Sequence, residues 1–439
     1  GTRPLMDQGP LDTALAWRRA DQTEIAAQQT ALLRRHIKQA MHGAFYREKL
    51  TKLAMSPADI TSLADLRHLP LTSRQDLNND GHLFQAVVEQ DIVDIALTSG
   101  TTGTPVQVPY TRNDLTRLAV NEAIAFWGAG VRPGHRFLVC VTLDRCFIAG
   151  LAYYSGLVEL GAGAIRSGAG QLARQWQLIQ QLRPTGLIGV PSFLLQIADW
   201  GREHGYEPRR MGIESLITIG EPIRRPDFTL TILGRELTEA WGAPIHVSYG
   251  ATELETGISE CRQGRGGHVH PELSLVEIID EQGKPVADGE PGELVVTPLG
   301  VEGFPLIRLR TGDISLVHRA PSPCGWQTPR IGPIEGRLAQ RLKVRGTTIY
   351  PEVIFQTLQQ IPAIEASYIE VRAAYDLSDL VTVVIGSRLP LDKKEVEALL
   401  QAQLRVRLTV EQHALEEVEK TMAGGHKTKK FFDFRPERK

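Results

Sequence analysis

A run of glycine and hydroxyl residues, LTSGTTGTP at positions 97–105, follows the largely apolar stretch 92–97. After a strand, such a run offers backbone N–H groups that can turn toward one point, and its hydroxyls add further donors. This combination suits phosphate oxygens, so Thr98 and the residues after it are candidate phosphate ligands. The alternative is an ordinary surface turn, which isolated Gly-Thr runs also form.

Two other phosphate-binding patterns fit the chain less well. A Walker A loop requires a lysine before its final Ser or Thr, and position 104 is Thr. The segment GAGAIRSGAG has Gly161 and Gly163 in a G-x-G pattern, but Arg166 stands where a dinucleotide-binding loop needs its third glycine. The run at 97–105 therefore stays a candidate phosphate-binding loop, with the surface turn as its alternative.

Thiols and imidazoles form a second candidate site. Cys261 and His268 enclose six residues in CRQGRGGH, and Cys324 follows in PSPCGW. Cys and His are the usual ligands of Zn²⁺, and a closed tetrahedral site needs four of them. His270 is available as the fourth. A structural zinc site and two unrelated thiols beside a surface histidine both fit this pattern.

Strands that alternate with helices must position the phosphate loop, between about residues 90 and 250. Short apolar runs such as SLITIGEPI and IHVSYGATE end in Gly, Pro or hydroxyl residues, whereas LTRLAVNEAIAFWGAG is amphipathic and ends at Gly. This alternation predicts a mostly parallel sheet covered by helices on both faces. Ligands of such sheets lie at the carboxyl ends of the strands, so we expect the strand exits to line the site.

The rest of the chain has a different organisation. The first 75 residues have helical periodicity, and the stretch after residue 270 predicts antiparallel strands joined by DEQGK and DGEPG turns. The material after Gly336 mixes strand and helix patterns and is long enough for a core of its own. We predict an α/β fold with a large domain at 1–336 and a small α+β domain at 337–439.

Composition limits the class of protein. The chain has 439 residues, of which 42% are hydrophobic and 23% charged, as in ordinary soluble globular proteins. A net charge of -2 gives no global field toward nucleic acid or a membrane surface, and no apolar run has the roughly 18 residues of a spanning helix. The start of the sequence does not resemble a signal peptide, and its four scattered cysteines fit a reducing compartment. We therefore expect a cytoplasmic protein.

Several motifs, in chain order, resemble those of the adenylate-forming superfamily, which includes the acyl-CoA synthetases. They are TSGTTGTP, SYGATE at 248–253, RTGD at 310–313, EGR at 335–337 and GGHKTKKFFDFR at 424–435. AFYREKL, IGEPI and VRGTTIYPEVI are similar to the phenylacetate–CoA ligase family in particular. The resemblance implies a large domain of parallel sheets covered by helices, with a small β-barrel-like part, and a mobile C-terminal domain.

The resemblance also implies roles for individual residues. The loop would hold the β- and γ-phosphates of ATP, Glu253 would bind Mg²⁺, Tyr249 would stack on adenine and Asp313 would accept hydrogen bonds from ribose. The ATP- and AMP-binding residues implied in this way are Thr98, Ser99, Gly100, Thr102, Gly103, Gly220, Glu221, Pro222, Tyr249, Gly250, Thr252, Asp313 and Arg337. The implied catalytic residues are Lys427, Glu253 and Thr101.

Lys427 is assigned through the register of the C-terminal motif. Aligning Asp433 and Arg435 with the family's final D-x-R places Lys427 where a lysine bridges the α-phosphate and the attacking carboxylate. A shift of register would select Lys429 or Lys430 instead.

Two parts of the resemblance are weaker. Ala339 and Gln340 replace the carboxylates that usually follow the hinge arginine. In the family the small domain rotates at this hinge between the two half-reactions, so the replacement concerns the rotation that precedes thiol transfer. Phe147, Tyr153 and Tyr154 lie where the acid pocket of the family begins, although aromatic residues at helical spacing are also common in cores. The family favours an aryl or arylacetic acid as the substrate.

The function predicted in this way is an ATP-dependent acid–thiol ligase that forms acyl-AMP and then acyl-CoA. Its expected cofactors are ATP, Mg²⁺ and coenzyme A, with a structural Zn²⁺ as a further candidate. Its expected partner is a small carboxylic acid. We expect binding to neither nucleic acid nor a membrane, and a homodimer is one option for its assembly. The alternatives are activation for a carrier-protein or other acceptor, including F420-type acceptors, and a non-catalytic nucleotide-binding regulator.

Overall fold

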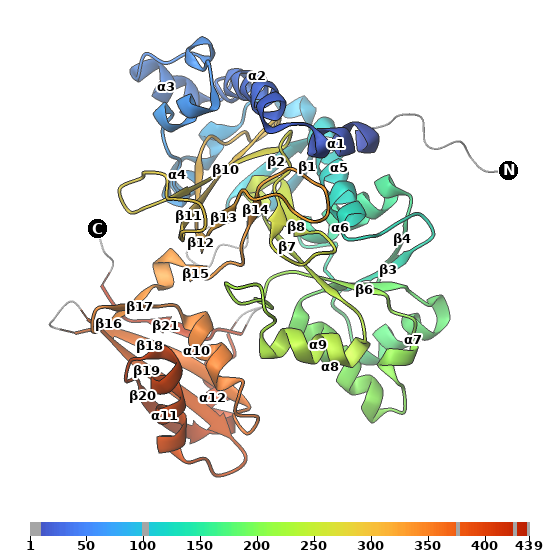
Figure 1. Ribbon diagram of the computed structural model, residues 1–439, viewed down its shortest axis with the longest axis vertical. Helices are drawn as coiled ribbons and strands as arrows, with labels where there is room; N and C mark the ends of the chain where they lie inside the picture. The colour runs from blue at the N-terminus through green and yellow to red at the C-terminus, as the bar shows by residue number, and fades with distance from the viewer. Residues whose placement is uncertain (1–9, 99–104, 375–377, 425–427, 437–439) are drawn as a thin grey trace. The chain divides into compact units, whose positions relative to one another are not determined.

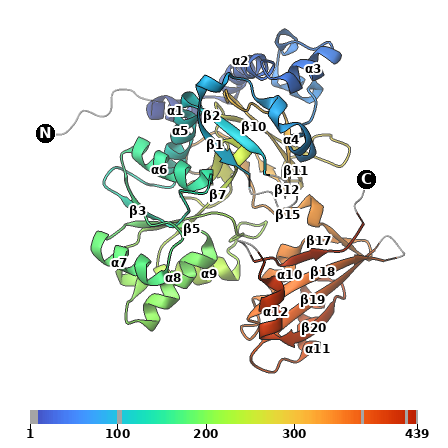
Figure 2. The same cartoon turned by 180° about the vertical axis from the view of Figure 1, so that it is seen from behind.

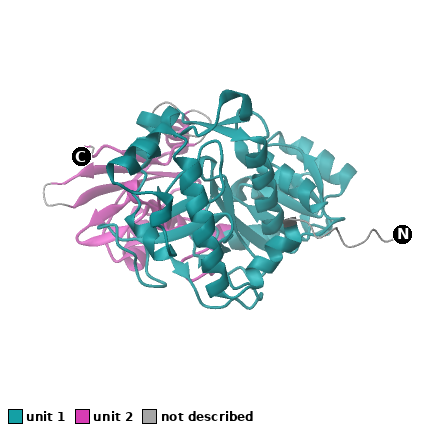
Figure 3. Ribbon diagram, turned by 90° about the horizontal axis from the view of Figure 1, so that it is seen from above, with its two compact units in different colours: residues 1–223, 234–311, 315–333 teal, residues 224–233, 312–314, 334–439 magenta. Residues whose placement is uncertain are grey.

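The computed structural model describes residues 10–98, 105–374, 378–424 and 428–436, which form two compact units (Figure 3). The first unit comprises residues 1–223, 234–311 and 315–333, and the second comprises 224–233, 312–314 and 334–439. The long segment of the second unit begins close to the expected boundary at Gly336. The division into functional domains at 1–336 and 337–439 stays a prediction.

The N-terminal part of the chain is helical, as its periodicity predicts. Its helices are α1 (Pro10–Arg19), α2 (Gln22–Ala40), α3 (Ala44–Lys52) and α4 (Arg74–Asp80), with 3₁₀ turns η1 (Pro57–Asp59), η2 (Leu63–His68), η3 (Gly81–Phe84) and η4 (Glu89–Asp91). Asp21 caps α2, and Ser73 caps α4 by accepting from the backbone N–H of Asp76. No helix in the described ranges is both long enough and apolar enough to cross a membrane.

A nine-stranded sheet is the centre of the first unit (Figure 1). In spatial order its strands are β13 (Val317–His318), β14 (Arg330–Ile331), β9 (Gly267–His268), β8 (Thr256–Glu260), β7 (Ile245–Ala251), β6 (Ser215–Thr218), β5 (Gly186–Gly189), β3 (Arg136–Val139) and β4 (Gly163–Arg166). The strands from β7 to β4 are parallel, which confirms the predicted parallel sheet. The strands from β7 to β13 are antiparallel and extend it.

Helices cover both faces of the parallel strands (Figures 1 and 2). They are α5 (Arg112–Gly128), α6 (Ile148–Leu160), α7 (Leu172–Leu182), α8 (Pro191–Glu203) and α9 (Ile232–Trp241), with η5 (Pro208–Arg210) after α8. Phe126 of α5 and Tyr153 of α6 pack with Ile217 of β6 in one core. On the other side, the indole N–H groups of Trp176 and Trp241 donate to carbonyl groups of α8.

Shorter sheets complete the first unit. A hairpin of β1 (Ile92–Leu97) and β2 (Gln107–Thr111) flanks the Gly-Thr run. The strands β10 (Ser274–Ile279), β11 (Gly292–Pro298) and β12 (Leu309–Ser315) are neighbours in a second sheet. The antiparallel pairing of β10 with β11 confirms the strand pattern expected after residue 270.

The second unit is an α+β fold, as predicted for the end of the chain. Its main sheet has the order β20 (Thr409–Ala414), β19 (Asp379–Ser387), β18 (Ala366–Ala373) and β21 (Phe431–Asp433). Its other elements are β15 (Gly336–Arg337), η7 (Leu338–Gln340), β16 (Leu342–Val344), β17 (Thr347–Ile349), α10 (Pro351–Leu358), α11 (Lys393–Leu404) and α12 (Leu415–Met422). Ile369 and Val383 face α10 and α11, whereas Tyr368 and Val384 face α12, so helices cover both faces of the sheet.

Candidate active site

Two of the predicted adenine-site segments lie side by side in the first unit. The strands β6 and β7 are parallel neighbours, with Thr218 opposite Val247. Gly220, Glu221 and Pro222 follow β6, and the Tyr249–Glu253 segment ends β7 and forms η6 (Thr252–Leu254). Both segments therefore leave the sheet at the edge where parallel sheets bind ligands.

Local contacts hold the segment after β6. Gly220 has a φ of 89°, a left-handed conformation that side chains other than glycine rarely adopt. Glu221 Oε1 accepts a hydrogen bond of 2.8 Å from the backbone N–H of Ser192, in the first turn of α8. The turn is therefore attached to the neighbouring strand-to-helix connection.

Glu253, the expected Mg²⁺ ligand, is buried with 2% exposure and forms an ion pair with Arg74. Arg74 begins α4, and its Nε also donates to the carbonyl oxygen of Thr311 at 3.1 Å. Nothing in SRQDL distinguishes Arg74 from a solvated residue at a helix start, so no sequence pattern pointed to it. A buried carboxylate with a single cation partner can serve as a hard-metal ligand, as Mg²⁺ sites require.

The structure places the flanks of the Gly-Thr run. Thr98 exchanges two hydrogen bonds with Val106: its N–H donates to the Val106 carbonyl at 3.0 Å, and its Oγ1 accepts from the Val106 N–H at 2.9 Å. The hydroxyl of Tyr110 on β2 donates to the carbonyl of Thr252 at 3.1 Å. The hairpin that carries the run is thus attached directly to the segment that carries Glu253.

The run itself is outside the described residues. Ser99, Gly100, Thr101, Thr102 and Gly103 belong to it. Lys427 is likewise outside the described part of the chain. Their assigned roles stay predictions.

In the second unit, the predicted ribose and hinge residues meet. Asp313 on β12 lies opposite Arg337 on β15. Glu352, at the start of α10, is near both: burial raises the pKa of its carboxyl, Arg337 lowers it and Asp313 raises it. Its Oε2 has no hydrogen-bond partner among the residues described. Sequence analysis did not consider Glu352.

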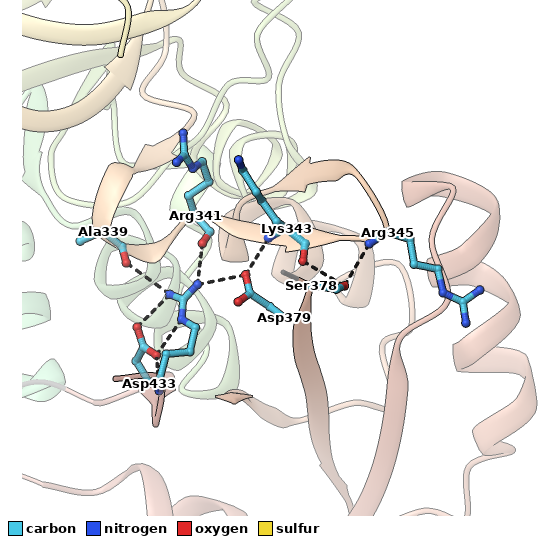
Figure 4. Close-up of polar contacts among 8 residues, drawn as sticks. Ala339, Arg341, Lys343, Arg345, Ser378, Asp379 and Asp433 are labelled. Atoms are coloured by element: carbon cyan, nitrogen blue, oxygen red, sulfur yellow. Dashed lines mark hydrogen bonds and ion pairs between the residues drawn. The ribbon is translucent and has the colours of Figure 1, made fainter. Parts of the chain in front are cut away.

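The segment after Arg337 lacks the expected carboxylates and is held through its backbone (Figure 4). Arg435 donates from Nη1 to the carbonyl of Arg341 at 2.9 Å and from Nη2 to that of Ala339 at 3.4 Å. The same guanidinium pairs with Asp379 at 3.0 Å, and Asp379 accepts from the N–H of Lys343 at 2.7 Å. In the sequence, Arg435 had served only to set the register of the C-terminal motif.

The three aromatic residues expected in the acid pocket have different environments. Phe147 precedes α6 and is 36% exposed, and Tyr154 is half-buried with the guanidinium of Arg166 5.6 Å from its ring centroid. Tyr153 is buried, and its ring centroid is 6.1 Å from that of Phe126. Of the three, only Tyr153 faces the interior of the unit.

The structure brings the predicted zinc ligands together. The ligand atoms of Cys261, His268 and Cys324 lie within 4.8 Å of one another, with His268 Nε2 at 3.3 Å from Cys324 Sγ. Burial lowers the pKa of His268 to about 4, which keeps its imidazole in the neutral form that binds metals. His270, which the sequence offers as a candidate fourth ligand, is not in this cluster. Its Nδ1 lies 2.6 Å from the guanidinium of Arg18.

Comparison with known proteins decides the family. The model of the family described as AMP-binding enzyme matches residues 25–301. The phenylacetate-coenzyme A ligase of Thermus thermophilus is 32% identical over 330 residues, which cover 74% of this chain and 72% of the relative. The chain belongs to the AMP-binding enzyme family. The predicted resemblance to phenylacetate–CoA ligases is confirmed.

A further relative of this AMP-binding enzyme is the phenylacetate-coenzyme A ligase of Escherichia coli, 30% identical over 79% of this chain and 78% of that one. Among solved structures, 2-hydroxyisobutyryl-CoA ligase in the postadenylation state matches with a TM-score of 0.84. The match covers 99% of this chain and 94% of that one at 23% identity, which shows a shared fold. The predicted α/β fold class is confirmed.

Proposed function

We propose that this AMP-binding enzyme is an ATP-dependent ligase that joins a carboxylic acid, of the aryl or arylacetic class, to coenzyme A. The observation that carries the proposal is the adjacency of Gly220–Pro222 and Tyr249–Glu253 at the exits of β6 and β7, within the region matched by the family. The phenylacetate-coenzyme A ligases among its relatives support coenzyme A as the acceptor.

The reaction proceeds in two displacements. A carboxylate oxygen of the acid attacks the α-phosphorus of ATP and pyrophosphate leaves, which gives acyl-AMP. The sulfur of coenzyme A then attacks the acyl carbon, loses its proton, and AMP leaves. Activation is needed because a carboxylate would otherwise have to expel oxide.

Residues of this chain would supply binding and charge neutralisation in the first displacement. Tyr249 stacks on adenine, Asp313 accepts from the ribose hydroxyls, and the Gly-Thr run holds the β- and γ-phosphates. Glu253 would hold Mg²⁺, which would offset the charge of the triphosphate. Lys427 contacts the α-phosphate and the attacking carboxylate, and so stabilises the charge that develops between them.

We also propose a structural zinc at Cys261, His268 and Cys324. The donors are two sulfurs and one neutral imidazole, ligand types typical of Zn²⁺, and a closed site would need one further ligand. We expect zinc in the purified protein at about one equivalent per chain, measured by elemental analysis, and its loss in Cys324→Ser. A zinc-free wild type that folds and keeps its activity would contradict this part.

The test of the ligase is acid-dependent exchange of labelled pyrophosphate into ATP, over a panel of aryl, arylacetic and short aliphatic acids. We expect exchange with one acid class, a loss of at least about a hundredfold in Lys427→Ala and Glu253→Gln, and little change in the exposed-lysine control Lys420→Ala. Exchange without acyl-CoA formation would indicate another acceptor. ATP binding without exchange for any acid would indicate a nucleotide-binding regulator.

A further inference from the structure

An amide and a carboxyl are buried in the middle of α5. Asn121 and Glu122 are 0% and 5% exposed, in a helix whose residues 121–126 are all buried. Carboxyl groups are rarely buried this deeply without a partner. Asn121 Nδ2 donates to Glu122 Oε1 at 3.2 Å, and Asn121 Oδ1 has no hydrogen-bond partner among the described residues. The pair therefore has at least one acceptor oxygen, Asn121 Oδ1, that no described residue uses.

Two glycines make room for the Glu122 side chain. A Cβ at Gly156 of α6 would overlap the Cβ of Glu122, and a Cβ at Gly257 of β8 would lie 2.6 Å from Glu122 Oε1. Helix α5 packs against both α6 and β8 (Figure 1). The carboxyl therefore occupies a space that other residues at positions 156 and 257 would close.

A small cavity lies beside the carboxyl. Its lining includes Glu122, Phe126, Ile217, His246, Ser259 and Glu260. The cavity is about the size of one water molecule. Of its other titratable groups, Glu260 already accepts a hydrogen bond from the N–H of Val247 at 3.1 Å, and His246 also has a partner. A single group of this size in the cavity could hydrogen-bond to Glu122.

The same cluster adjoins the nucleotide segment. Tyr153, one of the residues predicted for the acid pocket, is near both Glu122 and Ser248: burial and the charge of Glu122 raise the pKa of its hydroxyl, and Ser248 lowers it. Ser248 directly precedes Tyr249 on β7 and lies 3.2 Å from Ser259 between their hydroxyl oxygens. Tyr153 and Ser248 therefore lie between the buried pair on α5 and the part of β7 that is predicted to bind the nucleotide.

We propose that Glu122 and Asn121 recognise a hydrogen-bond donor, a hydroxyl or an amino group, on the acyl part of the acid substrate. This inference rests on the proposed ligase function and narrows its substrate class. Both side chains present acceptor oxygens, so an alkyl group leaves them unpaired and a second carboxylate is repelled. In the absence of the acid, a water molecule can take the donor's place in the cavity.

The electrostatics of the site allow both donors. Burial raises the pKa of Glu122 to about 7, so the carboxyl can stay neutral when nothing is bound. A hydroxyl can donate to either form of the carboxyl. An ammonium group favours the charged form and pairs with it, so the two donors will respond differently to removal of the charge.

The experiment compares kcat/KM for acyl-CoA formation with matched acids: an unsubstituted arylacetic or benzoic acid, its ring-hydroxyl derivatives and its ring-aminomethyl derivatives. Wild type is compared with Glu122→Gln, Asn121→Leu and the control Glu159→Gln, whose side chain is exposed on α6. We expect wild type to prefer a hydroxyl or ammonium acid over the parent by at least about tenfold. If the donor is an ammonium group, Glu122→Gln lowers that preference about tenfold or more, whereas a hydroxyl preference falls by less, because the amide oxygen still accepts.

The ranking of acids separates recognition from a structural role, since loss of folding lowers all rates together. Wild-type preference for the unsubstituted acid would overturn the inference even if the variants do not fold. A donor preference that survives in both Glu122→Gln and Asn121→Leu would overturn it too. Exchange with no acid at all would instead remove the ligase function on which it depends.

Discussion

Arg74 is the charged group that competes most directly for the proposed magnesium ligand. Its guanidinium pairs with the buried carboxylate of Glu253, and its side chain is 46% exposed. Solvent screens a pair of this kind, so its contribution is about 1 kcal/mol. Magnesium entry must weaken or share this pairing.

Arg74→Gln should therefore lower the magnesium concentration that half-saturates ATP–pyrophosphate exchange, by about fivefold for a pair of about 1 kcal/mol. The measurement is a magnesium titration at constant free ATP. Arg67→Gln is a matched control, because Arg67 is exposed. An unchanged or higher magnesium requirement in Arg74→Gln would show that the arginine does not compete with the metal.

Glu122 should make the stability of the protein depend on pH. Its pKa is raised from 4.5 to about 7 by burial, so between those values the folded state binds a proton that the unfolded state releases. Stability is therefore lost as pH rises from about 4.5 to 7. The loss at pH 8 is about 3 kcal/mol, since one pKa unit corresponds to about 1.4 kcal/mol.

Glu122→Gln removes this proton linkage. Relative to wild type, the variant should gain stability at pH 8 but not at pH 4.5, as measured by denaturant unfolding at both values. The same difference between the two proteins at both pH values would contradict a raised pKa in the folded state.

At the scale of elements, the contact of α5 with β8 depends on the absence of a side chain at Gly257. An added methyl group there meets Glu122 Oε1 at 2.6 Å and Asn121 Nδ2 at 3.3 Å, and no backbone atom is among its three nearest neighbours. Helix α5 and strand β8 can therefore approach closely because the side chain of Glu122 packs against a residue without a side chain.

A double-mutant cycle can measure this packing. Gly257→Ala should cost about 2 kcal/mol of unfolding free energy in wild type, because the buried carboxyl has little space to move. In a Glu122→Ala background the same change should cost well under 1 kcal/mol, since the colliding atoms are gone. Additive effects of the two substitutions would show that Glu122 does not determine the approach of the elements.

At the scale of the whole molecule, the second unit depends on one buried ion pair between distant parts of the chain. Arg435 and Asp379 have side chains that are 11% and 4% exposed and lie 56 residues apart in the sequence. The same arginine holds two backbone carbonyls of the segment 339–341 (Figure 4).

Arg435→Ala should therefore destabilise the second unit by about 3 kcal/mol, because it leaves the carboxylate of Asp379 buried and unpaired. Hydrogen exchange on the full chain should show faster exchange at the amide of Lys343, which donates to Asp379. Arg388→Ala is the control, since its pair with Glu365 is exposed and contributes at most about 1 kcal/mol. Equal protection at Lys343 in wild type and Arg435→Ala would contradict this role.

The sequence alone determined the family, the fold class and the order of the segments that form the proposed nucleotide site. Strand runs that end in Gly, Pro or hydroxyl residues predicted the exits at Gly220–Pro222 and Tyr249–Glu253, because the periodicity of a strand and the residue types of its turn are local properties. The polar pair in LAVNEAIAF was a visible signal for Glu122, since it interrupts an otherwise apolar helical run. Residue type also identified Cys261, His268 and Cys324 as a possible cluster, and the structure places them together.

Only the tertiary structure decided which side chains meet. Arg74 and Glu253 are 179 residues apart, and no spacing rule connects them. His270 was a candidate to join the thiols, but it lies against Arg18 of α1 instead. The space around Glu122 depends on glycines from two other elements, α6 and β8. Local sequence sets the conformation of each element, whereas the partners of a buried charge follow from how distant elements pack.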